Sequence, residues 1–293
     1  MQTANNEAQK TQSLLRMQQD EINSYHTYKK LALLVKDPSN SRVISAIADA
    51  ELTHYNTLKN ITQQDVKPQW VIIYFFIGLC RLLGLTFGIK LMERGEEQAQ
   101  VIYQSLISIY PQLEAIWHDE EQHEEALLEM LDEEGLKYAG SVVLGLNDAL
   151  VELTGALAGL TFAFQNTHII ALAGMITGIS ASFSMAASEY LSSKADPEGQ
   201  DPIKSAIYTG IAYIFTVILL IFPYLVAENY LICLAWTIAN AILIIAAFNY
   251  YISVAKGFNF RKRFTEMTVI SLGVALFSFG IGFLIRTLFG IDI

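Results

Sequence analysis

The chain contains 293 residues, of which 53% are hydrophobic, and it carries a formal net charge of −10. This composition is too apolar for a soluble protein of this length, so part of the chain is expected to lie in a lipid bilayer. The acidic charge gives no reason to expect a nucleic-acid partner. Charged side chains concentrate before residue 138, where 20 acidic and 12 basic residues occur. We therefore predict two all-α domains, residues 1–136 and residues 137–293.

Two amphipathic helices are predicted before residue 66. The first covers about residues 7–36, and the second extends to about residue 65, with Ser39 or Asn40 as its cap after a turn at Asp37 and Pro38. In both helices, apolar residues recur every three or four positions and define the inward face. The two inward series are Leu14, Met17, Glu21, Ser24, Tyr28, Leu31 and Val35, followed by Val43, Ile47, Glu51, His54, Leu58 and Ile61.

Residues 70–89 form an almost wholly apolar crossover. Gly78, Gly84, Gly88 and Arg81 interrupt it. Because of these interruptions, we favour a helix that lies on the membrane surface or in a dimer interface over a true membrane span.

Two more amphipathic helices follow, separated by Pro111 and ended by Gly135. Their inward series are Ile89, Met92, Glu96, Ala99, Tyr103, Leu106 and Tyr110, followed by Leu113, Ile116, Glu120, His123, Leu127 and Met130. Glu120 and His123 repeat the spacing of Glu51 and His54, and side chains three residues apart share one face of a helix. Four helices thus each direct a carboxylate to a shared core, and two of them add a histidine.

Four buried carboxylates without partners would cost far more than the roughly 5–15 kcal/mol by which a domain is stable. Two divalent cations would remove this cost, and four Glu with two His from four helices are the ligands of di-iron carboxylate proteins. Over residues 8–134 the sequence resembles the ferritin-like superfamily, most closely its rubrerythrin and erythrin branch. The resemblance implies a ferritin-like four-helix bundle with an iron site. Its ligands would be Glu21, Glu51, His54, Glu96, Glu120 and His123, with Glu93 or Glu97 as a further carboxylate.

Five apolar segments follow, each long enough to cross a bilayer. They cover residues 140–164, 169–190, 203–226, 230–254 and 267–289. Lys and Arg occur in the loops after the second and fourth segments and are absent from the loops after the first and third. By the positive-inside rule, we expect the N-terminal domain in the cytoplasm and the C-terminus outside the cytoplasmic (inner) membrane.

The first two spans contain residues that lipid disfavours. Asp148 and Glu152 lie one turn apart in the first span, and Met185 and Glu189 do so in the second. A carboxylate at the bilayer centre costs about 2.5–3.5 kcal/mol, which indicates a functional role. Carboxylates and a thioether together offer hard and soft ligands that suit Fe(II), and protonation of the carboxylates would allow counter-transport.

The first two spans contain the motifs Gly145-Leu-Asn-Asp148, Glu152-Leu-Thr-Gly155 and Met185-Ala-Ala-Ser-Glu-Tyr190. Through these motifs, the sequence over residues 138–290 resembles the vacuolar iron transporter family. The resemblance implies a five-span homodimer that moves Fe(II), and sometimes Mn(II), out of the cytosol against protons. Asp148, Glu152, Met185 and Glu189 would line its path. Plant proteins that resemble this family insert an acidic metal-collecting region between spans two and three. Here residues 194–204 form a short loop, so the N-terminal bundle could collect metal instead.

The whole chain resembles the bacterial membrane-bound ferritin group, and we interpret it as an iron exporter with a di-iron bundle that senses, collects or oxidises iron. The alternative is a membrane-anchored di-iron oxidase or peroxidase, whose anchor would have no need of carboxylates within the spans. Small residues on spans one and two are expected to form the dimer interface. These are Gly155, Ala158, Gly159, Gly174, Gly178 and Ala181.

Overall fold

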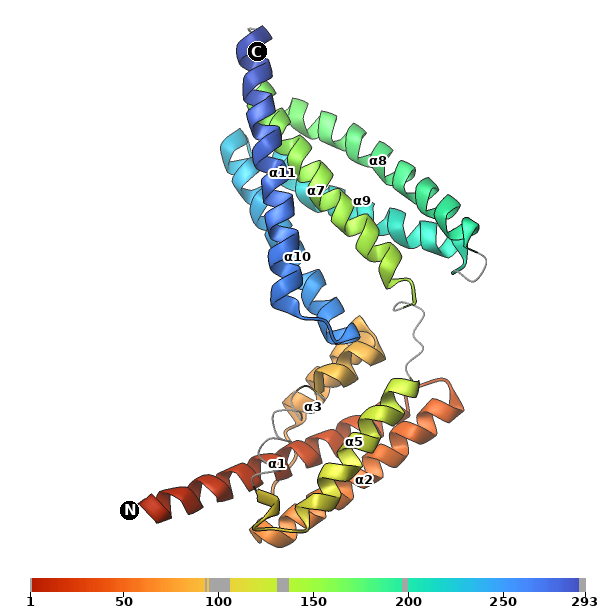
Figure 1. Ribbon diagram of the computed structural model, residues 1–293, viewed down its shortest axis with the longest axis vertical. Coiled ribbons are helices and arrows are strands. Elements are labelled where there is room, and N and C mark those ends of the chain that lie inside the picture. Colours follow the sequence, from red (N-terminus) through yellow and green to blue (C-terminus); the bar gives the residue numbers. More distant parts are fainter. Residues whose placement is uncertain (1, 93, 95–105, 131–136, 197–199, 290–293) are drawn as a thin grey trace. The chain divides into compact units, whose positions relative to one another are not determined.

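The computed structural model describes residues 2–92, 94, 106–130, 137–196 and 200–289 (Figure 1). These residues form helices and the short connections between them, and no strand occurs among them. The all-α class is therefore confirmed. Backbone contacts divide the chain into two compact units, Met1–Glu133 and Glu134–Ile293. The sequence places the boundary at residues 136 and 137. The assignment of the first unit as a ferritin-like domain stays a prediction.

In the first unit, α2 (Pro38–Thr62) packs against both α1 (Gln2–Ala32) and α5 (Leu113–Met130). Asp37 is the N-cap of α2, since its carboxylate accepts hydrogen bonds from the backbone N–H groups of Ser39 and Asn40 at 2.8 and 2.9 Å. The expectation that Ser39 or Asn40 caps this helix is therefore wrong. Asp37 is the N-cap because Pro38, which lacks an N–H, fits the first position of the helix.

Most of the inward residues of α1, α2 and α5 are buried as the spacing predicts, whereas Val43, Ile61 and His123 are half-buried. Glu21, Glu51 and Glu120 are only 6%, 1% and 8% exposed. The acidic residues lie between two apolar clusters, so they form a polar layer that is shielded from water at both ends. One cluster contains Leu14, Met17, Leu58, Leu106, Leu113 and Ile116. The other includes Tyr28, Leu31, Ile44, Ile47, Ile89 and Leu127.

The apolar crossover folds as α3 (Trp70–Leu83), which packs on α1. Its 14 residues correspond to a length of about 21 Å, short of the roughly 30 Å of a hydrocarbon core. Gly84 ends the helix with a φ of 97°, a conformation that favours glycine. Residues 85–92 are helical again, but Glu93, Glu96 and Glu97 lie outside the described residues. Their predicted role as ligands therefore stays a prediction.

The described residues of the second unit include five helices that are long and apolar enough to cross a membrane, as predicted. They are α7 (Ala139–Phe164), α8 (Thr167–Ala195), α9 (Pro202–Val226), α10 (Tyr230–Lys256) and α11 (Phe260–Phe289). Asn166, Asp201 and Asn229 cap three of them. The helix α11 starts before the apolar segment predicted from residue 267, since Asn259 accepts a hydrogen bond from the backbone of Lys262. The protein is thus a multi-pass membrane protein.

Small residues on α7 and α8 bring the helices of one chain together. A Cβ added at Gly159 would lie 3.1 Å from the carbonyl oxygen of Ser278 on α11, and one at Gly178 would lie 2.7 Å from Val217 Cγ1 on α9. Gly155 and Gly174 face α11 and α7 in the same way. These glycines serve packing within the chain, and their expected place in a dimer interface stays a prediction. The homodimer itself stays a prediction.

Candidate metal centre and membrane path

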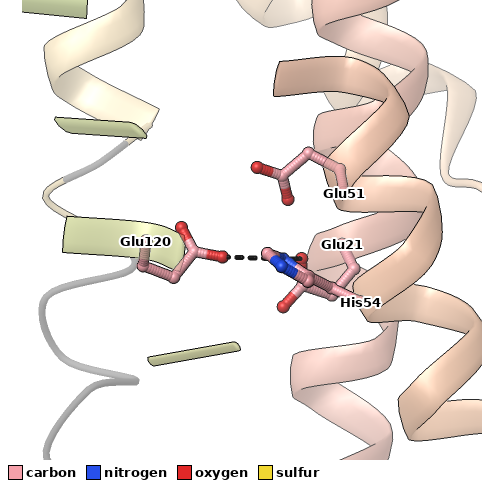
Figure 2. A group of neighbouring side chains, drawn as sticks. All are labelled: Glu21, Glu51, His54 and Glu120. Atoms are coloured by element: carbon pink, nitrogen blue, oxygen red, sulfur yellow. Dashed lines mark ion pairs between the residues drawn. The ribbon is translucent and has the colours of Figure 1, made fainter. Parts of the chain in front are cut away.

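Three helices of the first unit bring four potential metal ligands to one point. Glu21 comes from α1, Glu51 and His54 from α2, and Glu120 from α5. Figure 2 shows that these side chains point toward one another. One ligand atom from each residue can be chosen so that all four atoms lie within 4.8 Å of one another. Because each residue takes its place from the apolar series of its own helix, packing of the two apolar clusters assembles the site.

Each histidine faces the glutamate of the other Glu-x-x-His motif. His54 Nδ1 lies 3.1 Å from Glu120 Oε1 and 3.6 Å from Glu21 Oε2. His123 Nδ1 lies 3.4 Å from Glu51 Oε1. The two imidazole rings are stacked with their centroids 5.7 Å apart. The motifs therefore form one paired arrangement across α2 and α5.

The charges of this layer are strongly coupled. Burial disfavours the protonated form of His54, but the carboxylates of Glu120 and Glu21 outweigh this effect and raise its pKa to about 11. Burial raises the pKa of the Glu120 carboxyl, against the opposing effect of His54. Burial and the nearby His54 charge lower the pKa of His123. Without a metal, the His54 imidazolium supplies positive charge to the carboxylates.

The residues present fit a divalent cation. His123 Nδ1 is buried without a hydrogen-bond partner, although it faces the carboxylates. The donor atoms are carboxylate oxygens and imidazole nitrogens, which suit iron and manganese. The structure gathers Glu21, Glu51, His54 and Glu120 with His123 beside them. It therefore places five of the predicted ligands together. The other predicted ligands, Glu93, Glu96 and Glu97, lie outside the described residues.

The structure adds Asp119, which the sequence reasoning did not single out. Its Oδ2 lies 3.2 Å from His54 Nε2, the ring nitrogen that points away from the glutamates. The side chain of Asp119 is 50% exposed. A carboxylate on the distal nitrogen of a metal-binding histidine fixes the orientation of the ring. Its position directly before Glu120 could have identified Asp119 as a candidate. Several other acidic residues lie in the same segment, however, so position alone does not single it out.

In the second unit, hydroxyl groups hold two of the predicted path residues. Glu189 Oε1 accepts a hydrogen bond of 2.7 Å from Ser141 Oγ on α7. Glu152 Oε2 accepts one of 3.2 Å from the Tyr213 hydroxyl on α9. The sequence reasoning missed Ser141 and Tyr213. Both could have been noticed as polar side chains within a membrane span.

The remaining path residues lie on the same helices. Asp148 interacts with Glu152 through its carboxyl group, and Met185 is partly buried against the apolar core of this unit. Within the described part of the chain, the one group of at least three acidic, His or Cys ligands that could hold an ion is the one in the first unit. The four path residues thus lie on α7 and α8 and form no such group among the described residues of one chain.

The segment that contains α7 and α8 is similar to a known family. Residues 139–200 match the VIT family. The matched segment contains all four predicted path residues, and the family together with five spans indicates a membrane metal ion transporter. A search of curated protein sequences gave no match.

Proposed function

We propose that the protein exports Fe(II) from the cytoplasm across the inner membrane in exchange for protons, with Mn(II) as a second cargo. The VIT family match carries this proposal, because the matched residues 139–200 include Asp148, Glu152, Met185 and Glu189. The positive charges in the loops after the second and fourth spans favour a cytoplasmic N-terminal unit. The metal centre of the first unit would then lie on the side from which the cargo leaves.

The contacts in the spans support proton exchange. Tyr213 and Ser141 donate hydrogen bonds to Glu152 and Glu189, which reduces the cost of carboxylates in an apolar surrounding. Asp148 and Glu152 interact with each other, and two adjacent carboxyl groups are most stable when they share a proton. A divalent cation that binds to such a pair displaces this proton. Outward metal movement would thus be coupled to proton exchange.

We also infer that two copies form the transporter. Glu152 lies near the middle of α7 and is exposed within a single chain. Toward lipid, a carboxylate at this depth costs about 2.5–3.5 kcal/mol. A second copy that covers Glu152 would remove this cost and would enclose the path. The glycines of α7 and α8 already pack within one chain, so the exposure of Glu152 alone supports the second copy.

In the first unit, Glu21, Glu51, His54, Glu120 and His123 would hold iron. Bound iron supplies one-electron redox chemistry. The protein residues compensate the charge, exclude water between the two apolar clusters and keep the histidines oriented. This arrangement serves iron collection or oxidation ahead of export. It would also serve the alternative function, a membrane-anchored oxidase or peroxidase, which leaves Asp148, Glu152 and Glu189 unexplained.

Metal flux in vesicles distinguishes the two functions. The full chain is reconstituted in proteoliposomes with an imposed pH gradient and supplied with Fe(II), Mn(II), Co(II) or Zn(II). If the protein is an exporter, Fe(II) flux should depend on the size of the pH gradient, and protons should move in the direction opposite to Fe(II). Absence of flux for every metal, together with consumption of peroxide or oxygen, would establish the anchored oxidase instead.

A further inference from the structure

The helix α3 has one packed face and one exposed apolar face. Ile73, Ile77 and Cys80 are buried against the cluster formed by α1 and α2. The opposite face is open, with Val71 85% and Leu82 81% exposed. Trp70, Ile72, Tyr74 and Phe75 are also exposed. Large apolar side chains gathered on one face of a soluble unit indicate a binding surface.

The charges on α3 itself and beside its aromatic side chains are basic, while Asp20 on α1 lines the cavity next to Ile72 and Phe76. The sequence Trp70–Leu83 contains no acidic residue, and Arg81 is its one charged residue and is exposed. From α1, Lys30 Nζ lies 5.7 Å from the centroid of the Trp70 ring and 5.1 Å from that of Tyr74. Tryptophan and tyrosine beside lysine or arginine are typical of segments at a membrane interface. The face therefore has the chemistry of a helix that lies in the headgroup region of an anionic leaflet.

A short connection joins the first unit to the helices that span the bilayer. α5 ends at Met130 and the first membrane helix begins at Ala139, so the eight residues between them allow at most about 30 Å of separation. A surface tethered at this range meets the membrane at a high effective concentration, and even modest affinity for lipid is sufficient.

We propose that α3 lies in the headgroup region of the bilayer that the second unit spans, with Val71, Phe75 and Leu82 toward the acyl chains. Lys30 and Arg81 would contact anionic headgroups at the edge of the buried strip. The lipid surface is favoured over a second copy of the chain because the rim is basic and aromatic, which complements anionic lipid. Such docking would orient the metal centre relative to the membrane, whether or not the protein transports iron.

Depth-dependent quenching in the full chain tests this proposal. Val71→Cys and Leu82→Cys are each labelled with an environment-sensitive fluorophore, and Thr53→Cys on the exposed surface of α2 is the matched control. The native Cys80 and Cys233 are both buried. The variants are reconstituted in vesicles of phosphatidylcholine and phosphatidylglycerol that contain lipids with shallow or deep nitroxide groups.

We expect loss of fluorescence at residues 71 and 82, stronger with shallow than with deep nitroxide, and no loss at residue 53. Replacing Arg81 with Glu should reduce the loss at residue 82. Quenching of residues 71 and 82 by aqueous iodide without quenching by lipid would overturn the proposal. Cross-linking of Val71→Cys between two copies, without lipid quenching, would also overturn it and assign the face to a second copy.

Discussion

His54 Nε2 lies 3.2 Å from Asp119 Oδ2, while Nδ1 of the same ring faces Glu120 and Glu21. The two ring nitrogens thus have distinct partners, with Asp119 on one side and the proposed metal ligands on the other. A proton on Nε2, donated to Asp119, leaves the lone pair of neutral His54 on Nδ1. The contact therefore selects the tautomer that a metal requires.

We expect Asp119→Ala to weaken iron binding by about 10- to 100-fold, the usual effect of losing such a carboxylate. The fold should survive, because the Asp119 side chain is half exposed. Iron affinity of the full chain, measured by competition with a chelator, checks this prediction. Glu114→Ala removes an exposed carboxylate from the same helix and is the control. Equal affinities in the two variants would show that Asp119 does not position His54.

We expect the first unit to bind two iron ions per protomer, as the four carboxylates and two histidines predicted from the sequence require. Metal analysis of the full chain should therefore find about two fewer iron ions per protomer in the double variant Glu51→Gln, Glu120→Gln than in the wild type. These changes remove charge from buried positions that lie close to His54 and His123. Asp148→Ala, in the second unit, should leave these two ions in place. A loss of one ion or none would contradict a di-iron site.

Iron binding should release protons near neutral pH. The pKa of His54 is raised to about 11 by Glu120 and Glu21, so the ring is protonated in the metal-free protein, whereas ligation needs its neutral form. Because binding removes this proton, apparent affinity should increase with pH, about tenfold per unit for one proton. Calorimetry in buffers that differ in protonation enthalpy measures the number released. His123 adds none at pH 7, since its pKa is lowered. Iron binding without proton release would refute this account.

Transport should depend on the carboxylates of the first two spans. We expect Asp148→Ala and Glu189→Ala each to abolish Fe(II) flux in vesicles, because each removes a proposed metal ligand and proton acceptor from the proposed path. Both variants should still insert, since removing a charge from a span favours insertion. Glu228→Ala, in the exposed turn between α9 and α10, is the control for loss of an acidic residue. Wild-type flux in the first two variants would favour the anchored oxidase.

The sequence alone determined which side chains face inward. Glu21, Glu51 and Glu120 occupy positions in apolar series with a spacing of three and four residues, and all three are buried. It also determined the five membrane helices, because crossing a bilayer requires a length and an apolar composition that few other segments have. Both properties are local, so each can be derived from a single segment.

The tertiary structure decided which residues meet. Periodicity assigns a face to a helix without naming the helix that covers it, so the pairing of His54 with Glu120 and of His123 with Glu51 could not be derived. For the same reason, the packing of Gly159 and Gly178 against α11 and α9 of their own chain could not be derived. The contacts of Asp119 and Tyr213 also depend on packing between distant segments. Neighbours of this kind are fixed only when all the helices pack together, because each apolar face can be covered by any partner of suitable shape.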